Sequence, residues 1–179
     1  MSKDKTSEYD TRKILEQMRE EYWQALVEPE AEEAKDVIQL VTIVLGDELF
    51  GIPAVQAKEI LKTPSLTRVP RTPQAVHGIF NLRGKITSVV DIRPVLGLKQ
   101  TEVDAKSRVV VIEAGSISTG VIVEDVREIT MIPSAAIIPV ARTIARKEYL
   151  TGQTELDGKV LVLLNIEKIL AAPEFAVHV

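Results

Sequence analysis

From position 37 onward the sequence is a succession of short apolar runs separated by turn residues, and this rhythm constrains the fold more than any other feature. About ten of the runs have the length and the β-branched content that favour strands. The strands are predicted at 37–45, 49–52, 55–61, 79–82, 85–90, 108–113, 120–124, 126–132, 154–156 and 159–164. Asp157-Gly158 predicts a tight hairpin between the last two, because both residues tolerate a positive φ.

The runs do not alternate with long helical patterns, so a parallel sheet of the βαβ type is not expected. Short helices are predicted after Thr72-Pro73, from Asp91 to Gly97 and from Asn165 to Pro173. No repeat at a fixed period is evident. These observations predict an all-β fold with a few short helices, built as barrels or as a sandwich.

The first 36 residues differ in composition from the rest of the chain. They contain no glycine, eleven Asp or Glu and six Lys or Arg, for a net charge of −5, whereas the remaining residues carry +1. Positions 10–27 form a helical pattern with Ile14, Met18, Tyr22 and Leu26 on one face. We predict an N-terminal helical, acidic extension with its linker over 1–36 and a main domain over 37–179. The helix either docks on its own domain, stays a half-ordered tail, or binds a partner.

Composition and motif content argue against several functional classes. The chain has no cysteine and only two histidines, so neither a metal site nor a cofactor site is expected. No phosphate-binding glycine loop occurs, and the near-neutral main domain lacks the basic surface of a nucleic-acid binder. No apolar run approaches the roughly 20 residues of a membrane helix, and no signal peptide is evident, so a cytoplasmic location without membrane insertion is expected. A small hydrolase that uses His77 as its base is the enzymatic alternative.

The most distinctive segment runs from His77 to Gly84. Two glycines, Gly78 and Gly84, bracket an apolar strand that contains Asn81 and Arg83. The guanidinium of Arg83 is a rigid fork of donors that suits carboxylates and carbonyl groups. The strand context and the flanking glycines favour a functional role for this arginine.

Seven segments of the chain, taken in order, are similar to those of a known family. They are Gly46-Asp47-Glu48-Leu49-Phe50-Gly51-Ile52, Lys58-Glu59-Ile60, Arg68-Val69-Pro70 with Thr72-Pro73, Gly78-Ile79-Phe80-Asn81-Leu82-Arg83-Gly84, Val89-Val90-Asp91-Ile92-Arg93, Tyr149-Leu150-Thr151-Gly152 and Leu164-Asn165-Ile166-Glu167-Lys168-Ile169-Leu170. Each segment alone is a weak signal. Together they span nearly all of residues 37–171, and the chain resembles the CheW-like family of chemotaxis coupling proteins.

The resemblance implies a fold and a role. The implied fold is two SH3-like five-stranded β-barrels with a hydrophobic core between them. The implied role is a non-catalytic adaptor, without a cofactor, that links the cytoplasmic tips of methyl-accepting chemoreceptors to the regulatory domain of a CheA-type histidine kinase, in receptor arrays at the inner membrane face. Two alternatives stay open, namely a regulatory module of another chemosensory pathway, with a twitching or non-motility output, and a part of a larger signalling protein.

The resemblance also implies a protein-binding site. Its residues are Ala57, Glu59, Ile60, Gly78, Ile79, Asn81, Leu82, Arg83, Gly84 and Val89. Apolar residues among them, namely Ile60, Ile79 and Val89, are expected to form a groove for a helical receptor hairpin. Glu59 and Arg83 are expected to form an ion pair that holds the groove residues in place.

Overall fold

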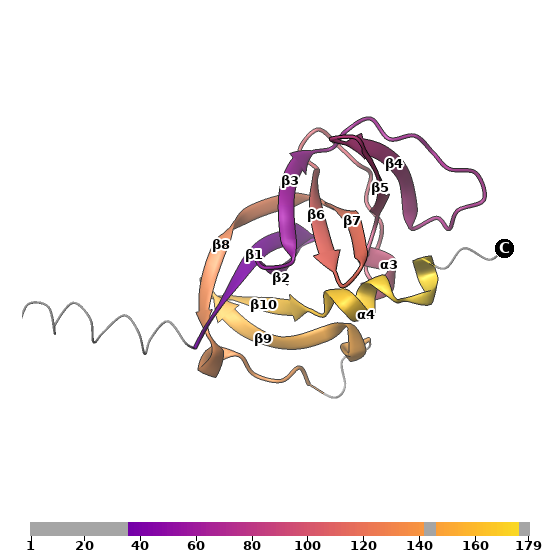
Figure 1. Cartoon of the computed structure of the whole chain (residues 1–179). Helices are drawn as coiled ribbons and strands as arrows, with labels where there is room; N and C mark the ends of the chain where they lie inside the picture. The colour runs from indigo at the N-terminus through magenta and orange to yellow at the C-terminus, as the bar shows by residue number, and fades with distance from the viewer. Residues whose placement is uncertain (1–35, 142–145, 176–179) are drawn as a thin grey trace, which may run out of the picture. The chain divides into compact units, whose positions relative to one another are not determined.

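A computed structural model describes residues 36–141 and 146–175; the predicted N-terminal helix, nearly all of its linker and His178 lie outside these ranges. The strands are β1 (Val37–Leu45), β2 (Glu48–Pro53), β3 (Ala57–Lys62), β4 (Val76–Leu82), β5 (Lys85–Val90), β6 (Arg108–Ala114), β7 (Ile117–Val123), β8 (Asp125–Pro133), β9 (Leu150–Leu156) and β10 (Lys159–Leu164). They form two five-stranded sheets (Figure 1). The strand order is β8-β1-β2-β10-β9 in one sheet, here called the first barrel, and β3-β6-β7-β5-β4 in the other, the second barrel.

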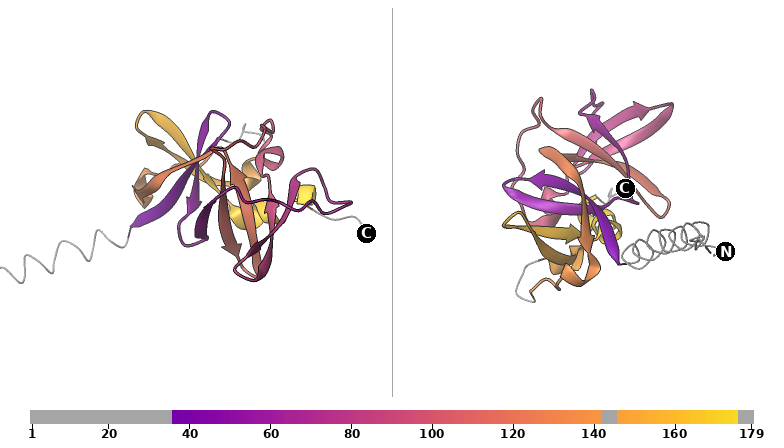
Figure 2. Two further views of the ribbon diagram at one scale, coloured as in Figure 1. Left: turned by 90° about the horizontal axis from the view of Figure 1, so that it is seen from above. Right: turned by 90° about the vertical axis from the view of Figure 1, so that its left-hand side faces the viewer.

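Each barrel combines antiparallel hairpins with one parallel pairing. In the first barrel β10 runs parallel to β2 and antiparallel to β9, and in the second barrel β5 runs parallel to β7 and antiparallel to β4. Both sheets are strongly curved and lie next to each other in all views (Figures 1 and 2). The predicted all-β fold of two five-stranded units is confirmed.

The largest apolar cluster lies between the two barrels and draws on both. It contains Val41 and Ile43 from β1 together with Val110 and Val121 from β6 and β7. Each barrel also has a smaller interior cluster of its own. These are Leu40, Ile132, Leu161 and Leu163 in the first barrel, and Phe80, Val89, Val109, Val111 and Ile122 in the second.

Strand periodicity explains how one strand serves two clusters. Successive side chains of a strand point to opposite faces. In β1, Leu40 therefore enters the interior of the first barrel, while its neighbour Val41 enters the shared core. Both side chains are buried, and burial of each contributes about 1.5–3 kcal/mol. Strands buried on both faces account for the nearly continuous apolar runs in the sequence.

Two of the three predicted short helices are present. Helix α3 (Arg93–Leu96) follows Asp91 and ends at Gly97, whose φ is 77°. Helix α4 (Ile166–Leu170) begins after Asn165, whose side chain accepts a hydrogen bond from the Lys168 N–H. Within the described ranges no helix is long and apolar enough to cross a membrane.

The helix predicted after Thr72-Pro73 is wrong. The Thr72 hydroxyl donates to the carbonyl oxygen of Val69, which precedes it, so it does not cap a following turn. The Val76 N–H then bonds to the carbonyl oxygen of Pro73, and the chain enters β4 directly. A tight turn therefore takes the place of the helix.

The two barrels contain the same supersecondary unit, although the chain as a whole has no repeat at a fixed period. In each unit a hairpin is followed at once by a short helix, and the second hairpin strand pairs in parallel with a strand from elsewhere in the barrel. The turns Arg83-Gly84 and Asp157-Gly158 both have positive φ at both residues. Strands β5 and β10, which follow these turns, also share one burial pattern. Residues 76–96 and 150–170 align without a gap, and six of the aligned pairs are identical: Gly78/Gly152, Leu82/Leu156, Gly84/Gly158, Lys85/Lys159, Ile92/Ile166 and Leu96/Leu170.

Candidate protein-interaction site

The β4–β5 hairpin ends in a two-residue turn formed by Arg83 and Gly84. Their φ angles are 50° and 88°, as a type I′ turn requires. The Asn81 side-chain oxygen accepts a hydrogen bond of 2.7 Å from the Gly84 N–H and thereby stabilises the turn. The sequence Asn-Leu-Arg-Gly thus builds an exposed tip with an arginine at its apex.

Arg83 forms the ion pair with Glu59 that the sequence predicts. Its Nη2 lies 2.9 Å from Glu59 Oε1. Glu59 lies on β3, and Arg83 directly follows β4. These two strands are the outermost strands of the second barrel. The pair therefore bridges the two edges of the sheet. The Arg83 side chain is 79% exposed, so the pair contributes at most about 1 kcal/mol to folding and is available to a partner.

The other predicted site residues on this side of the second barrel differ in exposure. Asn81 and Gly84 are exposed, and Ile60 is 45% exposed. Ala57, Ile79 and Leu82 are half-buried, with Leu82 packed against the interior cluster of the second barrel. A partner can reach Ile60 and Arg83 most directly.

Two of the predicted residues, Val89 and Gly78, are buried. Val89 is 0% exposed and packs inside the second barrel, so it does not line an exposed groove. Val89 lies on the face of β5 that points into the barrel. The sequence of a short apolar strand does not reveal which of its two faces points inward. A substitution of Val89 would therefore change binding only indirectly, by displacing the residues that pack over it.

Gly78 brings a loop and a strand into close contact. Its φ is 147°, and a Cβ at this position would lie 2.6 Å from the carbonyl oxygen of Thr67. Thr67 pairs with Ile79 through two backbone hydrogen bonds, of 2.8 and 2.9 Å. Because it has no side chain, the glycine allows the β3–β4 loop to pack directly against β4. This packing supports the strand that leads to the candidate site.

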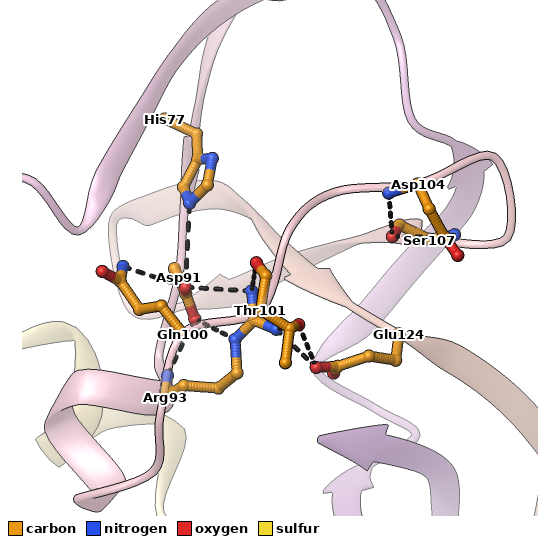
Figure 3. A network of polar contacts seen from close by, with 8 residues as sticks. All are labelled: His77, Asp91, Arg93, Gln100, Thr101, Asp104, Ser107 and Glu124. Atoms are coloured by element: carbon orange, nitrogen blue, oxygen red, sulfur yellow. Dashed lines mark hydrogen bonds and ion pairs between the residues drawn. The ribbon is translucent and has the colours of Figure 1, made fainter. Parts of the chain in front are cut away.

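A buried polar network beside α3 escaped sequence analysis (Figure 3). Asp91 is fully buried and receives three hydrogen bonds from Arg93, of 2.8 to 3.0 Å, through the backbone N–H, Nε and Nη2. Arg93 Nη1 also reaches Glu124, which stands between β7 and β8, and the Thr101 hydroxyl donates to the same carboxylate at 2.6 Å. The network ties α3 to the segment that leads from one barrel into the other.

Opposing effects set the charge state of Asp91. Burial alone would raise the pKa of its carboxyl group, but the donors of His77 and Arg93 and the positive charge of Arg93 hold the pKa well below its usual range. The distance from His77 Nε2 to Asp91 Oδ2 is 3.7 Å, which is longer than a hydrogen bond, so Arg93 is the main partner. Asp91 is therefore a carboxylate anion whose charge is paired with the Arg93 guanidinium.

The same geometry bears on the hydrolase alternative. His77 lies beside Asp91, as the base of a catalytic triad would. The nearby Thr101 hydroxyl, however, donates to Glu124, and across the described ranges no Ser or Thr hydroxyl forms a hydrogen bond with His77. The arrangement does not support a triad through Thr101. It makes His77 a neighbour of a structural ion pair.

The described residues thus define a class of molecule: a double-barrel β module with an exposed hairpin tip at Arg83-Gly84 and a buried Asp91–Arg93 ion pair at the opposite end of the same hairpin. The model of the CheW-like domain family matches residues 39–174. The chain is 31% identical over 140 residues to the chemotaxis protein CheW of Helicobacter pylori, which covers 78% of this chain and 85% of that protein. It is 32% identical over 141 residues to the chemotaxis protein CheW of Klebsiella aerogenes, with 77% and 84% covered.

A solved structure gives the same result. The crystal structure of the scaffolding protein TtCheW from Thermoanaerobacter tengcongensis superposes with a TM-score of 0.70 at 28% identity, over 76% of this chain and 90% of that one. The chain belongs to the CheW-like domain family.

Proposed function

We propose that this protein is a non-catalytic adaptor of chemotaxis signalling that couples chemoreceptor tips to the regulatory domain of a CheA-type histidine kinase in the cytoplasm. Membership of the CheW-like family supports the adaptor role, and the relatives are named as chemotaxis and scaffolding proteins. The observation that carries the site is the exposed Arg83–Glu59 pair at the hairpin tip.

The tip offers a partner both apolar contact and fixed charge. Ile60 on β3 and Ile86 on β5 are exposed, and Ile86 is paired across the hairpin with Asn81. A receptor helix that lays an apolar stripe along these residues would place its carboxylates or carbonyl groups within reach of Arg83. Glu59 holds the guanidinium in one orientation, which lowers the entropy lost on binding.

Coupling requires a second contact with the kinase. The two barrels share a core, so a partner on one barrel is held at a fixed orientation to a partner on the other. A receptor that changes shape can shift the kinase equilibrium only through contacts that differ between the two kinase states. Small interfaces repeated across an array would supply the necessary avidity.

The test is a titration of the full chain against a CheA regulatory domain and, separately, a receptor tip. Replacement Arg83→Ala should weaken binding to at least one partner by about tenfold or more, because a desolvated arginine is a common hot spot. Arg127→Ala is the matched control, since Arg127 also forms an exposed ion pair, with Asp125 at 3.4 Å, but in the first barrel. Wild-type protein that binds neither partner would refute the proposed function.

A double-mutant cycle separates the role of the ion pair from that of Arg83 alone. If Glu59 positions Arg83 for the partner, the losses caused by Glu59→Ala and Arg83→Ala should not add, and the coupling energy should differ from zero. Additive losses would leave two independent contacts and remove the positioning role of Glu59.

A further inference from the structure

Between β1 and β10 the chain passes from one barrel to the other twice, and the two crossings are held in different ways. Backbone groups hold the first crossing, which lies between β2 and β3. There the Ala54 N–H donates to the Gln39 carbonyl oxygen of β1, and the Gln56 carbonyl oxygen accepts from the Glu113 N–H of β6, each at 2.9 Å. These bonds do not depend on which side chains the crossing carries.

The second crossing, between β7 and β8, is the single residue Glu124. Its N–H donates to the Val44 carbonyl oxygen of β1 at 3.2 Å, which ties it to the first barrel. Its carboxylate accepts hydrogen bonds from Arg93 Nη1 in α3 and from the Thr101 hydroxyl in the loop after α3 (Figure 3). Helix α3 and this loop connect β5 with β6, so both donors belong to the second barrel. At this crossing one side chain links the two barrels.

Arg93 is a rigid anchor for the Glu124 carboxylate. Its side chain is 2% exposed and holds the fully buried Asp91 carboxylate through Nε and Nη2. Nη1 donates to Glu124 instead. Because a guanidinium is planar, the two side-chain bonds to Asp91 fix the direction in which Nη1 can donate. The position of Glu124 relative to α3 is therefore set by geometry as well as by charge.

A second contact from the side of the first barrel reaches the other end of α3. Arg146 Nη1 donates to the Val95 carbonyl oxygen at 2.7 Å, and the chain continues from Arg146 through the turn η2 (Lys147–Tyr149) into β9. Helix α3 is thus bonded through Arg93 to Glu124 and near its end to Arg146. Two contacts at different points of one short helix resist its rotation better than one contact could.

The equivalent helix of the other barrel forms without such a clamp. In the gapless alignment of the two hairpin–helix units, Asn165 and Glu167 stand at the positions of Asp91 and Arg93. Helix α4 nevertheless forms, with Asn165 as its N-cap, and Glu167 is exposed. The buried ion pair and its bond to Glu124 are therefore not required to build the unit. The contact with the crossing residue is what distinguishes α3.

The shared apolar core defines the angle between the barrels less sharply than a hydrogen bond does. Apolar contacts, such as those in the cluster that joins Ile43 with Val110 and Val121, are non-directional. They oppose separation of the barrels more strongly than a small rotation. Hydrogen bonds weaken steeply as their angle departs from linear. A buried hydrogen-bonded network that forms in one arrangement of the barrels therefore favours that arrangement.

We propose that Glu124 is a positioning residue that sets the angle between the two barrels through Arg93 and α3. The consequence for signalling rests on the proposed function. If the receptor and the kinase are held on different barrels, this angle is the angle at which the adaptor presents one to the other. Loss of the Glu124 contact should then uncouple the two partners while both binding surfaces stay intact.

Because the sequence contains no cysteine, spin labels can be attached at two chosen sites of the full chain. Lys62→Cys on β3 and Glu155→Cys on β9 place one label on each barrel, and both positions are exposed. Double electron–electron resonance then measures the distribution of distances between the labels. We expect a narrow distribution when Glu124 is present and a shifted or clearly broader one in Glu124→Ala. An unchanged distribution in Glu124→Ala would overturn the proposal.

Asp125→Ala is the matched control, because Asp125 is the neighbouring carboxylate and pairs with Arg127 of its own strand at 3.4 Å. Within the described ranges its side chain forms no hydrogen bond or ion pair with the second barrel. The distance distribution should therefore stay as it is without the substitution. Equal broadening in Asp125→Ala and Glu124→Ala would mean that any change at the start of β8 alters the angle, and the specific role of Glu124 would be wrong.

Two further measurements separate a changed angle from a loss of folding. The melting temperature of Glu124→Ala should fall only slightly, since Asp91 keeps Arg93 as its partner. Thr101→Val removes one donor to Glu124 without removing a charge, and it should change the distance distribution in the same direction but less. If Glu124→Ala does not fold, Thr101→Val decides the question, and an unchanged distribution in that variant would contradict the assignment.

Assays with a CheA-type kinase and a receptor tip test the consequence for signalling. Glu124→Ala should bind each partner with wild-type affinity and lose receptor control of kinase activity. If the wild-type chain binds neither partner, the proposed function fails, whereas the measured distances still decide the role of Glu124. Reduced affinity for one partner together with an unchanged distance distribution would place Glu124 in a binding surface and refute its positioning role.

Discussion

Asp91 and Arg93 illustrate what a sequence does and does not disclose about a single residue. The position of Asp91 before an apolar turn predicts a helix cap, but the N-cap of α3 is Ile92, and no side chain caps the helix from that position. Asp91 lies one residue earlier, and its carboxylate accepts a hydrogen bond from the Arg93 N–H. The larger role comes from the Arg93 side chain, which is 2% exposed and folds back onto the carboxylate. Burial of two charges depends on neighbours that are distant in sequence, such as Glu124, and no local pattern contains them.

This burial predicts unequal costs for two arginine substitutions. Arg93→Ala should lower the free energy of unfolding by about 3–5 kcal/mol, because it leaves the fully buried Asp91 carboxylate without its partner. Arg127→Ala removes an exposed ion pair and should cost less than about 1 kcal/mol. Urea denaturation of the full chain measures both. Equal losses would mean that the Asp91–Arg93 pair is no stronger than a surface contact.

The residues of the candidate site also differ in how well the sequence predicts their surroundings. The Glu59–Arg83 pair was predictable, because the family resemblance marks both residues. The burial of Val89 was not, because a short apolar strand can present either face to the core.

At the scale of elements, the strands were easier to predict than the loops. The bounds predicted for β1, β5 and β10 are those of the structure, because glycine, aspartate or asparagine stands directly before and after each of these strands. Strand β9 begins at Leu150, four residues before the predicted start, since Thr151, Gly152 and Gln153 look like a loop in sequence. Their backbone pairing with β10 and Ile138 comes from tertiary context.

Two glycines of the β4–β5 hairpin should differ in their tolerance of a methyl group. A Cβ on Gly84 meets nothing within 4 Å, so Gly84→Ala carries only the cost of its positive φ, about 1–2 kcal/mol. A Cβ on Gly78 collides with the Thr67 backbone, and Gly78→Ala should add about 1–3 kcal/mol for the forced displacement.

The measurement is thermal or urea unfolding, combined with hydrogen exchange at the Thr67 and Ile79 amides. Exchange there should accelerate in Gly78→Ala and not in Gly84→Ala, because only the first substitution separates the loop from β4. If both variants lose the same stability and keep the same protection, the close approach at Gly78 is not what requires glycine.

For the molecule as a whole, the shared core predicts that the barrels unfold together. Val110, Ile112 and Val121 of the second barrel pack in one cluster with Ile43 and Ile52 of the first. Separating the barrels would expose this cluster to water, at about 25 cal/mol for each Å² of apolar surface. Amide signals from β4 and from β9 should therefore disappear at one urea midpoint. Two midpoints would show that each barrel is stable without the other.

The order of strands along the chain has a consequence for biosynthesis. The second barrel is continuous in sequence, from β3 to β7, whereas the first is assembled from β1 and β2 at one end and β8 to β10 at the other. During translation β2 therefore emerges from the ribosome long before β10, the strand that pairs with its second edge. Until β10 arrives, this edge of β2 can pair with wrong partners. The second barrel, which is continuous in sequence, can fold next and cover the apolar face of the β1–β2 hairpin. The nascent chain therefore has a folded surface for the hairpin to pack on before β8 to β10 are translated.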